Sequence, residues 1–555
     1  MGFRRSRVQI SPPRFLPECS TSVSLSFSGV GTMGSRSGVA TVAFLSLLSW
    51  PGPASAQEPP GSLAIVGATI IDGHGGAPIA DGTIVIEGDR IAAVGPRASV
   101  AVPEGAEVID GSGKFLTPGF VDTNVHMSLA FGRGPRVEEH AAYWAQHEAL
   151  ILQGLQLHLK HGVTTVRDSY GVLRPMQRVK KKIDSGEEIG PRTYLAGNIV
   201  GWGGPASETF AGFPESGISF FAERMNDEVT LGSGEEMMHM TPDELRVAIN
   251  AYLDHGPDFI KYGATHHFNY PAGISFSPRA QRVIVEEAHR RGLVAETHAT
   301  SLEGLRLSIL AGIDLIQHPD NVGNRTITDE LVDMIVERGI VCSMLINQFT
   351  GPSWQFHVRN MERAREDLAE ARARDRQRRI PPTTAEIRRR VQDTGLPQPG
   401  SVMEGRWTTK RTNAKKLIEA GCIVTVGTDN TLFGRGGVAA GFLREEPENM
   451  EHQLPGKGTI FAIEGLVELG MTPLEAITAA TKNGAIASKA LDEYGTLEAG
   501  KAADIVVLDA DPLADIANLR QLSMVIRGGR IVDIEALPTD PIALDWAAGP
   551  PNGSR

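Results

Sequence analysis

The sequence predicts an α/β fold in which a (β/α)8 TIM barrel is combined with a small discontinuous β-sandwich domain formed by both chain ends. Two observations predict it. In the middle of the 555-residue chain, short apolar strands alternate with helical stretches, which is the pattern of parallel strands joined by helices. On either side of this middle, the segments are rich in β-branched residues and turn signals, as expected for antiparallel strands.

The expected barrel strands are short apolar runs. Several start directly after a glycine that follows a helix end, as at Gly162, Gly292, Gly339 and Gly421, and glycine beyond the last helical turn is a common helix stop. Eight such runs fit a TIM barrel, whose active site lies at the carboxyl ends of its strands. The expected strands are 117–126, 163–168, 192–199, 258–263, 293–298, 313–318, 339–345 and 422–429.

Strand patterns also occupy both flanks of this region. Residues 64–72 form one strand pattern and residues 83–95 form a hairpin pattern with Gly-Asp at the turn. Residues 503–509 and 524–532 repeat this style near the other end. The expected domains are therefore residues 57–115 and 490–540 as the two parts of one β-sandwich, with the barrel at 116–489 between them.

One stretch departs from the barrel pattern. Residues 353–411 are dense in Arg and Glu and contain few large apolar residues. We expect a charged helical insertion between strands seven and eight, on the active-site side. Such an insertion is either a solvated pair of surface helices or a lid over the site.

The N-terminus has the pattern of an export signal. Arg36 precedes the apolar run 39–48, and Ala54-Ser55-Ala56 follows two prolines. A basic start, a short apolar core and an A-x-A site predict a signal peptide, and the apolar run is shorter than the roughly 20 residues that span a bilayer. We expect residues 1–56 to be a leader and signal peptide. The mature protein would then be periplasmic or secreted, with no stable membrane span.

Composition narrows the partners. The net charge is −12, from 54 Lys and Arg against 66 Asp and Glu, so the basic footprint of a nucleic-acid binder is missing and no nucleic-acid partner is expected. Cys342 and Cys422 lie in short apolar runs and predict buried free thiols, since nothing resembles a disulfide framework. The expected partner is a small-molecule substrate, and a homo-oligomer is compatible with the sequence.

Side chains that can bind metal stand at the ends of five expected strands. Strand one ends with Asp122, Asn124 and His126, which share one face because alternate residues of a strand do so. Imidazole and carboxylate groups together suit a divalent ion such as zinc, and a buried lysine is costly unless its charge is paired or removed. The other strand-end residues are Lys261, His298, His318 and Asp429.

Lys261 offers a further ligand after reaction with carbon dioxide, because the resulting carbamate can bridge two metal ions. Burial lowers the pKa of a lysine, and the neutral amine is the reactive form. Taken singly, a strand histidine is more often a core or surface residue than a ligand, and a lone lysine is more often a paired surface residue. The combined order on the expected strands reverses this expectation and predicts a divalent metal site, with zinc as the expected ion.

These residues lie in motifs that resemble the amidohydrolase superfamily, in the branch of imidazolonepropionase-like and metal-dependent dipeptidase-like enzymes. The resemblance covers nearly the whole chain after the leader. The motifs that carry it are LTPGFVD at 116–122, GVTTVRD at 162–168, ETHA at 296–299, IQH at 316–318, GTD at 427–429 and GTLEAGKAADIV at 495–506.

The resemblance implies metal-dependent hydrolysis. It identifies His126 with the second histidine of the strand-one H-x-H pair, Lys261 with the carboxylated bridging lysine, and His298 and His318 with the two later histidines. Asp429 takes the place of the catalytic aspartate, which binds metal and exchanges a proton with the attacking water.

The chain departs from the family pattern at Asn124, which stands where the first strand-one histidine is expected. A carboxamide oxygen is a weaker zinc ligand than imidazole. Three alternatives remain: a metal bound through Asn124, an enzyme that works with one metal ion, or a metal-binding homologue that has lost catalysis. Because the other ligands are retained, activity with one or two ions is expected.

The expected reaction is hydrolysis of an amide or related carbon–nitrogen bond in a peptide, an N-acyl amino acid or a related small substrate. Tyr262 or His266 would hydrogen-bond the oxyanion, Arg435 would hold a carboxylate, and Asn198 would line the pocket. Each is otherwise an ordinary loop residue. A cyclic amidine deaminase or a lactonase is the alternative within the superfamily, because a fold does not fix the substrate.

Overall fold

The computed structural model describes residues 61–129, 146–211, 220–267, 273–377, 383, 402–431 and 451–539. The export signal expected at residues 1–56 and the pocket residue Arg435 lie outside these ranges. Within them, no helix has both the length and the apolar character needed to cross a membrane.

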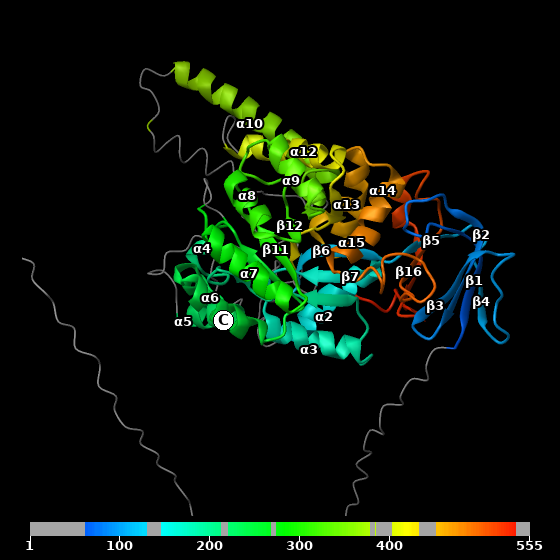
Figure 1. Cartoon of the computed structure of the whole chain (residues 1–555). Helices are drawn as coiled ribbons and strands as arrows, with labels where there is room; N and C mark the ends of the chain where they lie inside the picture. Colours follow the sequence, from blue (N-terminus) through cyan, green and yellow to red (C-terminus); the bar gives the residue numbers. More distant parts are fainter. Residues whose placement is uncertain are drawn as a thin grey trace, which may run out of the picture. The chain divides into compact units, whose positions relative to one another are not determined.

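Parallel strands form the middle of the chain and lie in two sheets (Figure 1). One sheet has the order β15-β6-β7-β8 and the other has the order β14-β13-β12-β11-β10-β9. Each of the eight expected ranges contains a described strand. The bounds are β6 Phe120–His126, β7 Val163–Asp168, β8 Arg192–Leu195, β9 Ile199–Val200, β10 Phe259–Gly263, β11 Val294–His298, β12 Leu315–Gln317, β13 Val341–Met344, β14 Ile423–Val426 and β15 Asn430–Thr431.

The range expected as the third strand, 192–199, is broken. Gly197 lies between β8 and β9 with a φ of 74°, a conformation that glycine adopts at little cost. β8 and β9 therefore belong to different sheets. The fold is TIM-barrel-like in its alternation of parallel strands and helices, and the described strands form two sheets where a single closed barrel was expected.

Helices connect the strands and bury their apolar faces against them, as the main hydrophobic core includes residues from both. Ser277, Ser301 and Thr328 each begin a helix by accepting a hydrogen bond from a backbone N–H of the first turn. The α-helices are α2 His147–Lys160, α3 Leu173–Asp184, α4 Glu208–Ala211, α5 Phe220–Thr230, α6 Pro242–Leu253, α7 Pro278–Arg290, α8 Leu302–Ala311, α9 Asp329–Glu337, α10 Gly351–Gln377, α12 Val402–Glu419, α13 Lys457–Glu468, α14 Pro473–Ala479 and α15 Lys482–Ala487. Short 3-10 helices are η2 Glu235–His239, η3 Ile346–Gln348, η5 Glu451–Gln453 and η6 Ile516–Arg520.

The charged segment expected at 353–411 contributes to α10 and α12, which lie between β13 and β14 in the chain. Helix α12 is tied to the loop after β12. Asn413 is fully buried, and its Nδ2 donates to the carbonyl oxygens of Asp320 and Arg325, each at 2.9 Å, while its Oδ1 accepts the backbone N–H of Ile327 at 2.9 Å. This contact fixes one face of α12 against the carboxyl end of β12.

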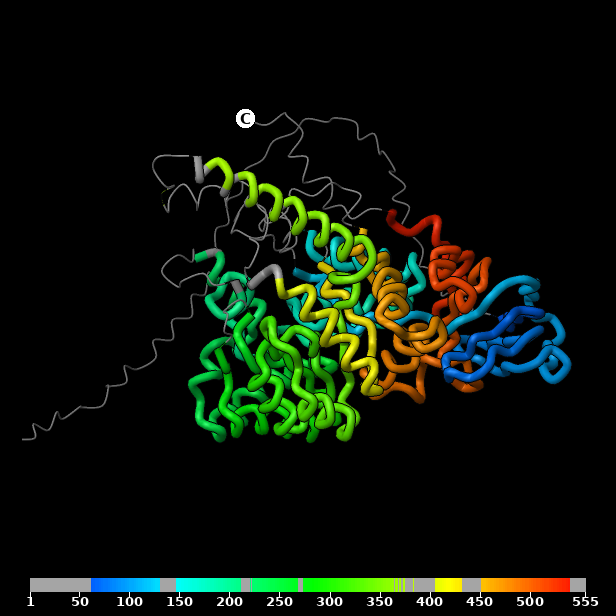
Figure 2. Tube along the Cα trace, turned by 90° about the horizontal axis from the view of Figure 1, so that it is seen from above, coloured from blue at the N-terminus to red at the C-terminus, as the bar shows by residue number. Residues whose placement is uncertain are grey.

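Both ends of the described chain meet in one eight-stranded sheet, and the blue strands and the orange-to-red segment lie side by side in Figures 1 and 2. Its order is β18-β17-β16-β5-β1-β2-β3, with β4 paired to β1. Because a single sheet is described, the sandwich stays a prediction. The bounds are β1 Leu63–Ile70, β2 Ile79–Glu87, β3 Arg90–Pro96, β4 Glu107–Asp110, β5 Phe115–Pro118, β16 Ile505–Leu508, β17 Leu522–Arg527 and β18 Arg530–Ile531.

The two parts of the fold are continuous at Gly119. Strand β5 pairs with β1 and β16 in the terminal sheet, and β6 begins one residue after Gly119 and pairs with β7. A Cβ at this position would overlap the side chain of Thr164. Only glycine therefore lets the chain pass this closely from one sheet to the other.

Asp504 links the terminal sheet to the parallel strands. Its side chain is buried and accepts hydrogen bonds from Arg192 of β8 at 2.8 Å, Arg527 of β17 at 3.2 Å and the backbone N–H of Gly528 at 2.8 Å. Burial raises the pKa of Asp504, but the two arginines and the backbone N–H outweigh it and hold the pKa below the ordinary value of 3.8. The ionised form is therefore favoured by folding, and its stabilisation is lost as the pH falls through this lowered pKa.

We expect Asp504→Asn to lower the free energy of unfolding at neutral pH by about 2–3 kcal/mol, because two partly buried arginines lose their carboxylate. The gap between variant and wild type should narrow as the pH falls to about 3, where the wild-type carboxylate begins to lose its advantage. Urea unfolding across this pH range measures both effects. Asp492→Asn, at an exposed position, is the control and should have no effect, and a gap that stays constant with pH would contradict the assignment.

Candidate active site

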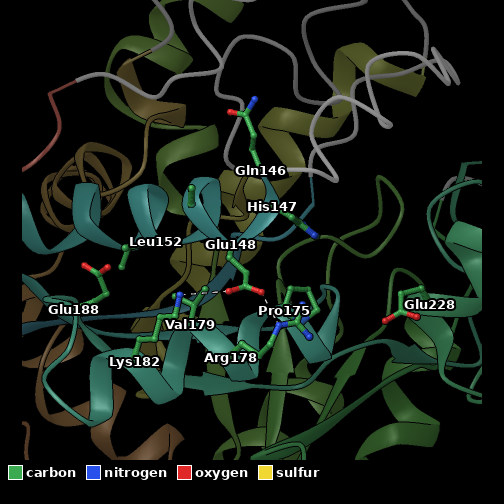
Figure 3. Close-up of a pocket in the computed structure, with 11 residues that line it drawn as sticks. Gln146, His147, Glu148, Leu152, Pro175, Arg178, Val179, Lys182, Glu188 and Glu228 are labelled. Carbon is green, nitrogen blue, oxygen red and sulfur yellow. Dashed lines mark hydrogen bonds and ion pairs between the residues drawn. The ribbon is translucent and has the colours of Figure 1, made fainter. Parts of the chain in front are cut away.

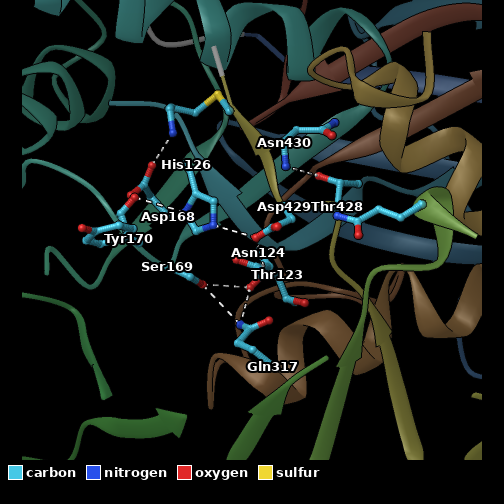
Figure 4. A network of polar contacts seen from close by, with 12 residues as sticks. Thr123, Asn124, His126, Asp168, Ser169, Tyr170, Gln317, Thr428, Asp429 and Asn430 are labelled. Atoms are coloured by element: carbon cyan, nitrogen blue, oxygen red, sulfur yellow. Dashed lines mark hydrogen bonds and ion pairs between the residues drawn. The ribbon is translucent and has the colours of Figure 1, made fainter. Parts of the chain in front are cut away.

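His126 and Asp429 meet at the ends of neighbouring strands (Figure 4). The Nε2 atom of His126 lies 2.8 Å from Oδ1 of Asp429, and its Nδ1 lies 3.1 Å from the carbonyl oxygen of Tyr170. A carbonyl oxygen only accepts, so Nδ1 carries the hydrogen and Nε2 of the neutral ring has a lone pair. Two acceptors would then face each other. The pair requires positive charge between them, either a proton on Nε2 or a shared cation.

His298 and His318 form a second pair. Their ring centroids are 4.6 Å apart, and both side chains are buried. The Nε2 atom of His298 and the Nδ1 atom of His318 have no hydrogen-bond partner among the described residues. Burial, reinforced by neighbouring cationic groups, lowers the pKa of both imidazoles well below the usual value. Both rings are therefore neutral near pH 7 and offer nitrogen lone pairs.

Lys261 lies on β10 with 2% of its surface exposed. Burial lowers the pKa of this lysine, and the charges of Glu296, Asp429 and Asp168 oppose the change. Its register partner on β11 is Glu296, whose carboxylate is already paired with Arg167 at 2.9 Å. A buried amine whose charge is disfavoured matches the reactive form that was expected for carboxylation.

The backbone is strained at two of these residues. Among the described non-glycine residues, six have a positive φ, and they include His318 at 43° and Asp429 at 59°. Such conformations cost roughly 1–3 kcal/mol and persist where the surroundings impose them. The backbone N–H of His318 donates to the Ser343 carbonyl at 2.6 Å, and that of Asp429 donates to the Asn124 carbonyl at 2.8 Å.

Asp122 holds the loop that carries Asp429. Its Oδ2 accepts hydrogen bonds from the hydroxyls of Thr428 at 2.8 Å and Thr459 at 2.7 Å, and its Oδ1 accepts the backbone N–H of Asn124 at 3.2 Å. Burial raises its pKa to about 6, although these hydrogen bonds oppose the rise. Asp122 is a positioning residue that joins the end of β6 to the strained turn at Asp429.

A layer of buried polar groups supports the strand ends. Gln317 donates through Nε2 to Glu296 at 3.1 Å, to the Thr123 carbonyl at 3.1 Å and to the Ser169 hydroxyl at 3.3 Å, and part of this network is visible in Figure 4. Glu296 in turn pairs with Arg167. The layer ties four strands together directly below the candidate site.

Two of the residues expected to line the pocket make side-chain hydrogen bonds to neighbouring elements. The hydroxyl of Tyr262 donates to Gln281 of α7 at 3.1 Å, on the opposite face of β10 from Lys261 because alternate residues face opposite ways. Asn198 donates through Nδ2 to the Trp202 carbonyl at 3.0 Å and to the Ser233 hydroxyl at 3.1 Å. The Tyr262 contact turns its hydroxyl towards α7, which corrects the role expected for Tyr262, whereas the role expected for Asn198 stays a prediction.

In the loop after β10, His267, which was not among the expected residues, lies beside the site, and the role expected for His266 stays a prediction. The His267 ring is 5.4 Å from that of His298 and stacks on Phe210 at 4.8 Å, and burial lowers its pKa to about 3. The backbone N–H of His266 donates to the Gly273 carbonyl at 3.1 Å. Trp202 completes an aromatic wall, with its ring 4.7 Å from His298.

Two buried charges that were absent from the expected set lie close by. Asp320 follows His318 by two residues and is fully buried, and no other residue in the described part of the chain donates to either of its carboxylate oxygens. Lys410 of α12 is 2% exposed, and its Nζ lies 3.5 Å from Oε1 of Gln348. Burial raises the pKa of Asp320 and lowers the pKa of Lys410 to about 8. The two charges influence each other but form no ion pair.

A cavity of about 610 Å³ lies elsewhere, between α2 and α3 (Figure 3). It is lined by charged side chains, and Glu148 pairs there with Arg178 at 2.6 Å and with Lys182 at 3.6 Å. None of the expected site residues lines it. The candidate chemistry therefore belongs to the strand ends.

The nitrogen and oxygen atoms at the strand ends are of the types that bind divalent cations. Within the described ranges, no three His, Cys, Asp or Glu side chains form a metal-binding group by themselves. His298 and His318 nevertheless present unpartnered buried nitrogens, His126 and Asp429 face each other at 2.8 Å, and Asn124 presents an amide oxygen with no partner among the described residues. Nitrogen and oxygen donors of this type are those that zinc binds.

Comparison with known proteins identifies the family. The amidohydrolase family model matches residues 115–532. The chain belongs to the amidohydrolase family. It is thus an enzyme that acts on carbon–nitrogen bonds, and the resemblance inferred from its motifs is confirmed.

Among solved structures, this amidohydrolase is similar to molinate hydrolase, with 29% identity, a TM-score of 0.71, and coverage of 89% of this chain and 98% of that chain. It is also similar to phenylurea hydrolase B, with 30% identity, a TM-score of 0.70, and coverage of 87% and 99%. Among curated proteins, ochratoxinase of Aspergillus niger is 23% identical over 490 residues, which cover 84% of this chain and 86% of the relative.

We expect Asp122→Ala in this amidohydrolase to lower metal affinity about 10- to 100-fold, because residues that orient ligands contribute on this scale. Asp122→Asn, which keeps an acceptor for the threonine hydroxyls, should lose less metal affinity than Asp122→Ala. Equilibrium dialysis against zinc measures the affinity. The melting temperature separates loss of positioning from unfolding, and equal zinc affinity in Asp122→Ala and the wild type would contradict the positioning role.

Proposed function

We propose that this amidohydrolase hydrolyses the amide-type carbon–nitrogen bond of a small, partly aromatic molecule, using one divalent ion held among His126, His298, His318 and Asp429. The observation that carries the proposal is the 2.8 Å approach of the His126 Nε2 atom to Asp429 while Nδ1 is committed to the Tyr170 carbonyl. A proton on Nε2 or a metal ion would satisfy this geometry, and a metal ion is the source of positive charge that also supports hydrolysis. Zinc is the ion that the donor set favours.

A bound divalent ion would supply an activated water and polarise the scissile carbonyl. Asp429 is suited to take the proton from that water, because its side chain is 37% exposed and so reaches solvent and substrate. Although burial opposes it, the hydrogen bond and charge of His126 hold the pKa of Asp429 below the usual range, so the acceptor is ionised. Attack by the oxygen of this water forms a new bond to the carbonyl carbon. Asp429 then passes the proton to the leaving nitrogen as the carbon–nitrogen bond breaks.

The aromatic wall supports an aromatic or apolar substituent on the substrate. Tyr170, Trp202, Phe210 and His267 pack edge to face or stacked beside His298. Such rings favour flat apolar groups. The relative named for phenylurea agrees with a substrate of this kind, and we propose N-aryl amides and ureas as the first compounds to test.

We expect Asp429→Asn to lower kcat by about 10²- to 10⁴-fold, because the proton acceptor is removed. The release of aniline from an N-aryl urea or amide is measured on zinc-loaded protein. Chelation of the metal should abolish the same activity and added zinc should restore it. The matched control is Asp333→Asn, at an exposed position on α9, and full turnover by Asp429→Asn would refute the proton transfer.

We expect Asn124→His to raise the zinc content from one ion per chain towards two, because imidazole is a stronger zinc ligand than a carboxamide. Elemental analysis after removal of loosely bound metal measures the stoichiometry. Two ions already present in the wild type would disprove the proposed single-ion site, independently of whether the enzyme is active.

A further inference from the structure

The loop after β12 and helix α12 bring two opposite charges together beside the candidate active site. Asp320 lies in the turn that follows His318, in which the backbone N–H of Asn321 donates to the His318 carbonyl at 2.9 Å. Lys410 projects from α12 one turn before Asn413, so the two residues share a face of the helix. Since Asn413 binds the Asp320 carbonyl at 2.9 Å, Lys410 and Asp320 are held in fixed relation.

Both charges are buried and lack the partners that burial demands. Among the described residues, no other residue donates to the Asp320 carboxylate, although a carboxylate can accept several hydrogen bonds. The Lys410 ammonium, with three donors, has one contact at 3.5 Å with Gln348 and lies 5.0 Å from the centroid of the Trp407 ring. An isolated buried charge is costly, and Lys410 and Asp320 do not form an ion pair with each other.

The two groups also adjoin the catalytic residues. The charge of Lys410 acts on both Asp429 and His318, and Asp320 is covalently next but one to His318. Lys410 therefore offers donors, and Asp320 offers acceptors, beside the chain segment that carries His318.

We propose that Lys410 and Asp320 recognise the uncharged amide or urea group of the substrate at two points, with Lys410 donating to its carbonyl oxygen and Asp320 accepting its N–H. A neutral dipolar group satisfies both charges. A carboxylate would be repelled by Asp320 and Asp429, and an ammonium group would be repelled by Lys410. This inference rests on the proposed function, and it restricts the substrates to amides and ureas that carry an N–H.

Two matched compounds test the proposal: 1,1-dimethyl-3-phenylurea, which has one N–H, and 1,1,3-trimethyl-3-phenylurea, in which a methyl group replaces that hydrogen. Affinity is measured by calorimetry on metal-free protein, and kcat/KM on zinc-loaded protein. We expect the wild type to prefer the N–H compound about tenfold or more, as for a buried hydrogen bond to a charged group. Equal affinity for the two ureas would overturn the proposal.

The variants separate the two contacts. Asp320→Asn should lose affinity for the N–H compound about tenfold and bind the methylated compound as before, whereas Lys410→Met should weaken both compounds to a similar extent because both carry the carbonyl. Lys415→Met, at an exposed position on α12, and Asp333→Asn are the controls. The assignment would be overturned if Asp320→Asn kept the wild-type ratio of affinities for the two ureas. It would also be overturned if the wild type bound the anion N-benzoylglycine more tightly than either urea.

Binding to metal-free protein distinguishes this inference from the proposed reaction. If the N–H preference holds in binding but neither urea is hydrolysed with any divalent ion, the reaction is wrong and the recognition site stands. If both ureas are hydrolysed at equal efficiency and bound equally, the reaction stands and the recognition site is wrong. The melting temperature of each variant is recorded, and the wild-type preference alone decides the outcome if a variant does not fold.

Discussion

The rest of the candidate site depends on the contact between His126 and Asp429, which needs positive charge between the two side chains. A histidine whose Nδ1 donates to a backbone carbonyl faces the Asp429 carboxylate through Nε2 at 2.8 Å, so the two groups need a proton on Nε2 or a shared cation between them. Positive charge must therefore be present at the strand ends. Burial holds His298 and His318 neutral and disfavours the charge on Lys261. The groups nearest this point therefore offer electron pairs of the kind that divalent cations accept.

The geometry of this point is imposed by the layer beneath it and by the backbone. His318 and Asp429 both adopt left-handed conformations that cost energy and need support. Asp122 supplies part of that support through the threonine hydroxyls, and Gln317 joins Glu296 to neighbouring strands. The site is thus held by buried hydrogen bonds whose partners are themselves tied to other strands, which limits how far any one ligand can shift.

The sequence predicted the strand ranges and the residues at the strand ends because each strand is a short apolar run bounded by glycine or polar residues, and because the motifs at those ends are ordered along the chain. It did not predict the break at Gly197, since one glycine in a strand pattern signals either a bend or a close approach. Tyr262 was misplaced because proximity in the chain was given more weight than strand alternation. Lys410 was missed because its burial depends on the contact between Asn413 and a loop some 90 residues away in sequence, a tertiary effect that local composition does not reveal.

The passage of β5 into β6 through Gly119 has a consequence for how the protein matures. Strand β6 carries Asn124 and His126, yet the strand that leads into it completes its pairing only with β16, at residues 505–508. A ribosome must therefore deliver almost the entire polypeptide before the first ligand strand is anchored at its beginning. Chains released early would have most of their helices but an incomplete catalytic centre. The protein therefore becomes active only when its translation is nearly complete.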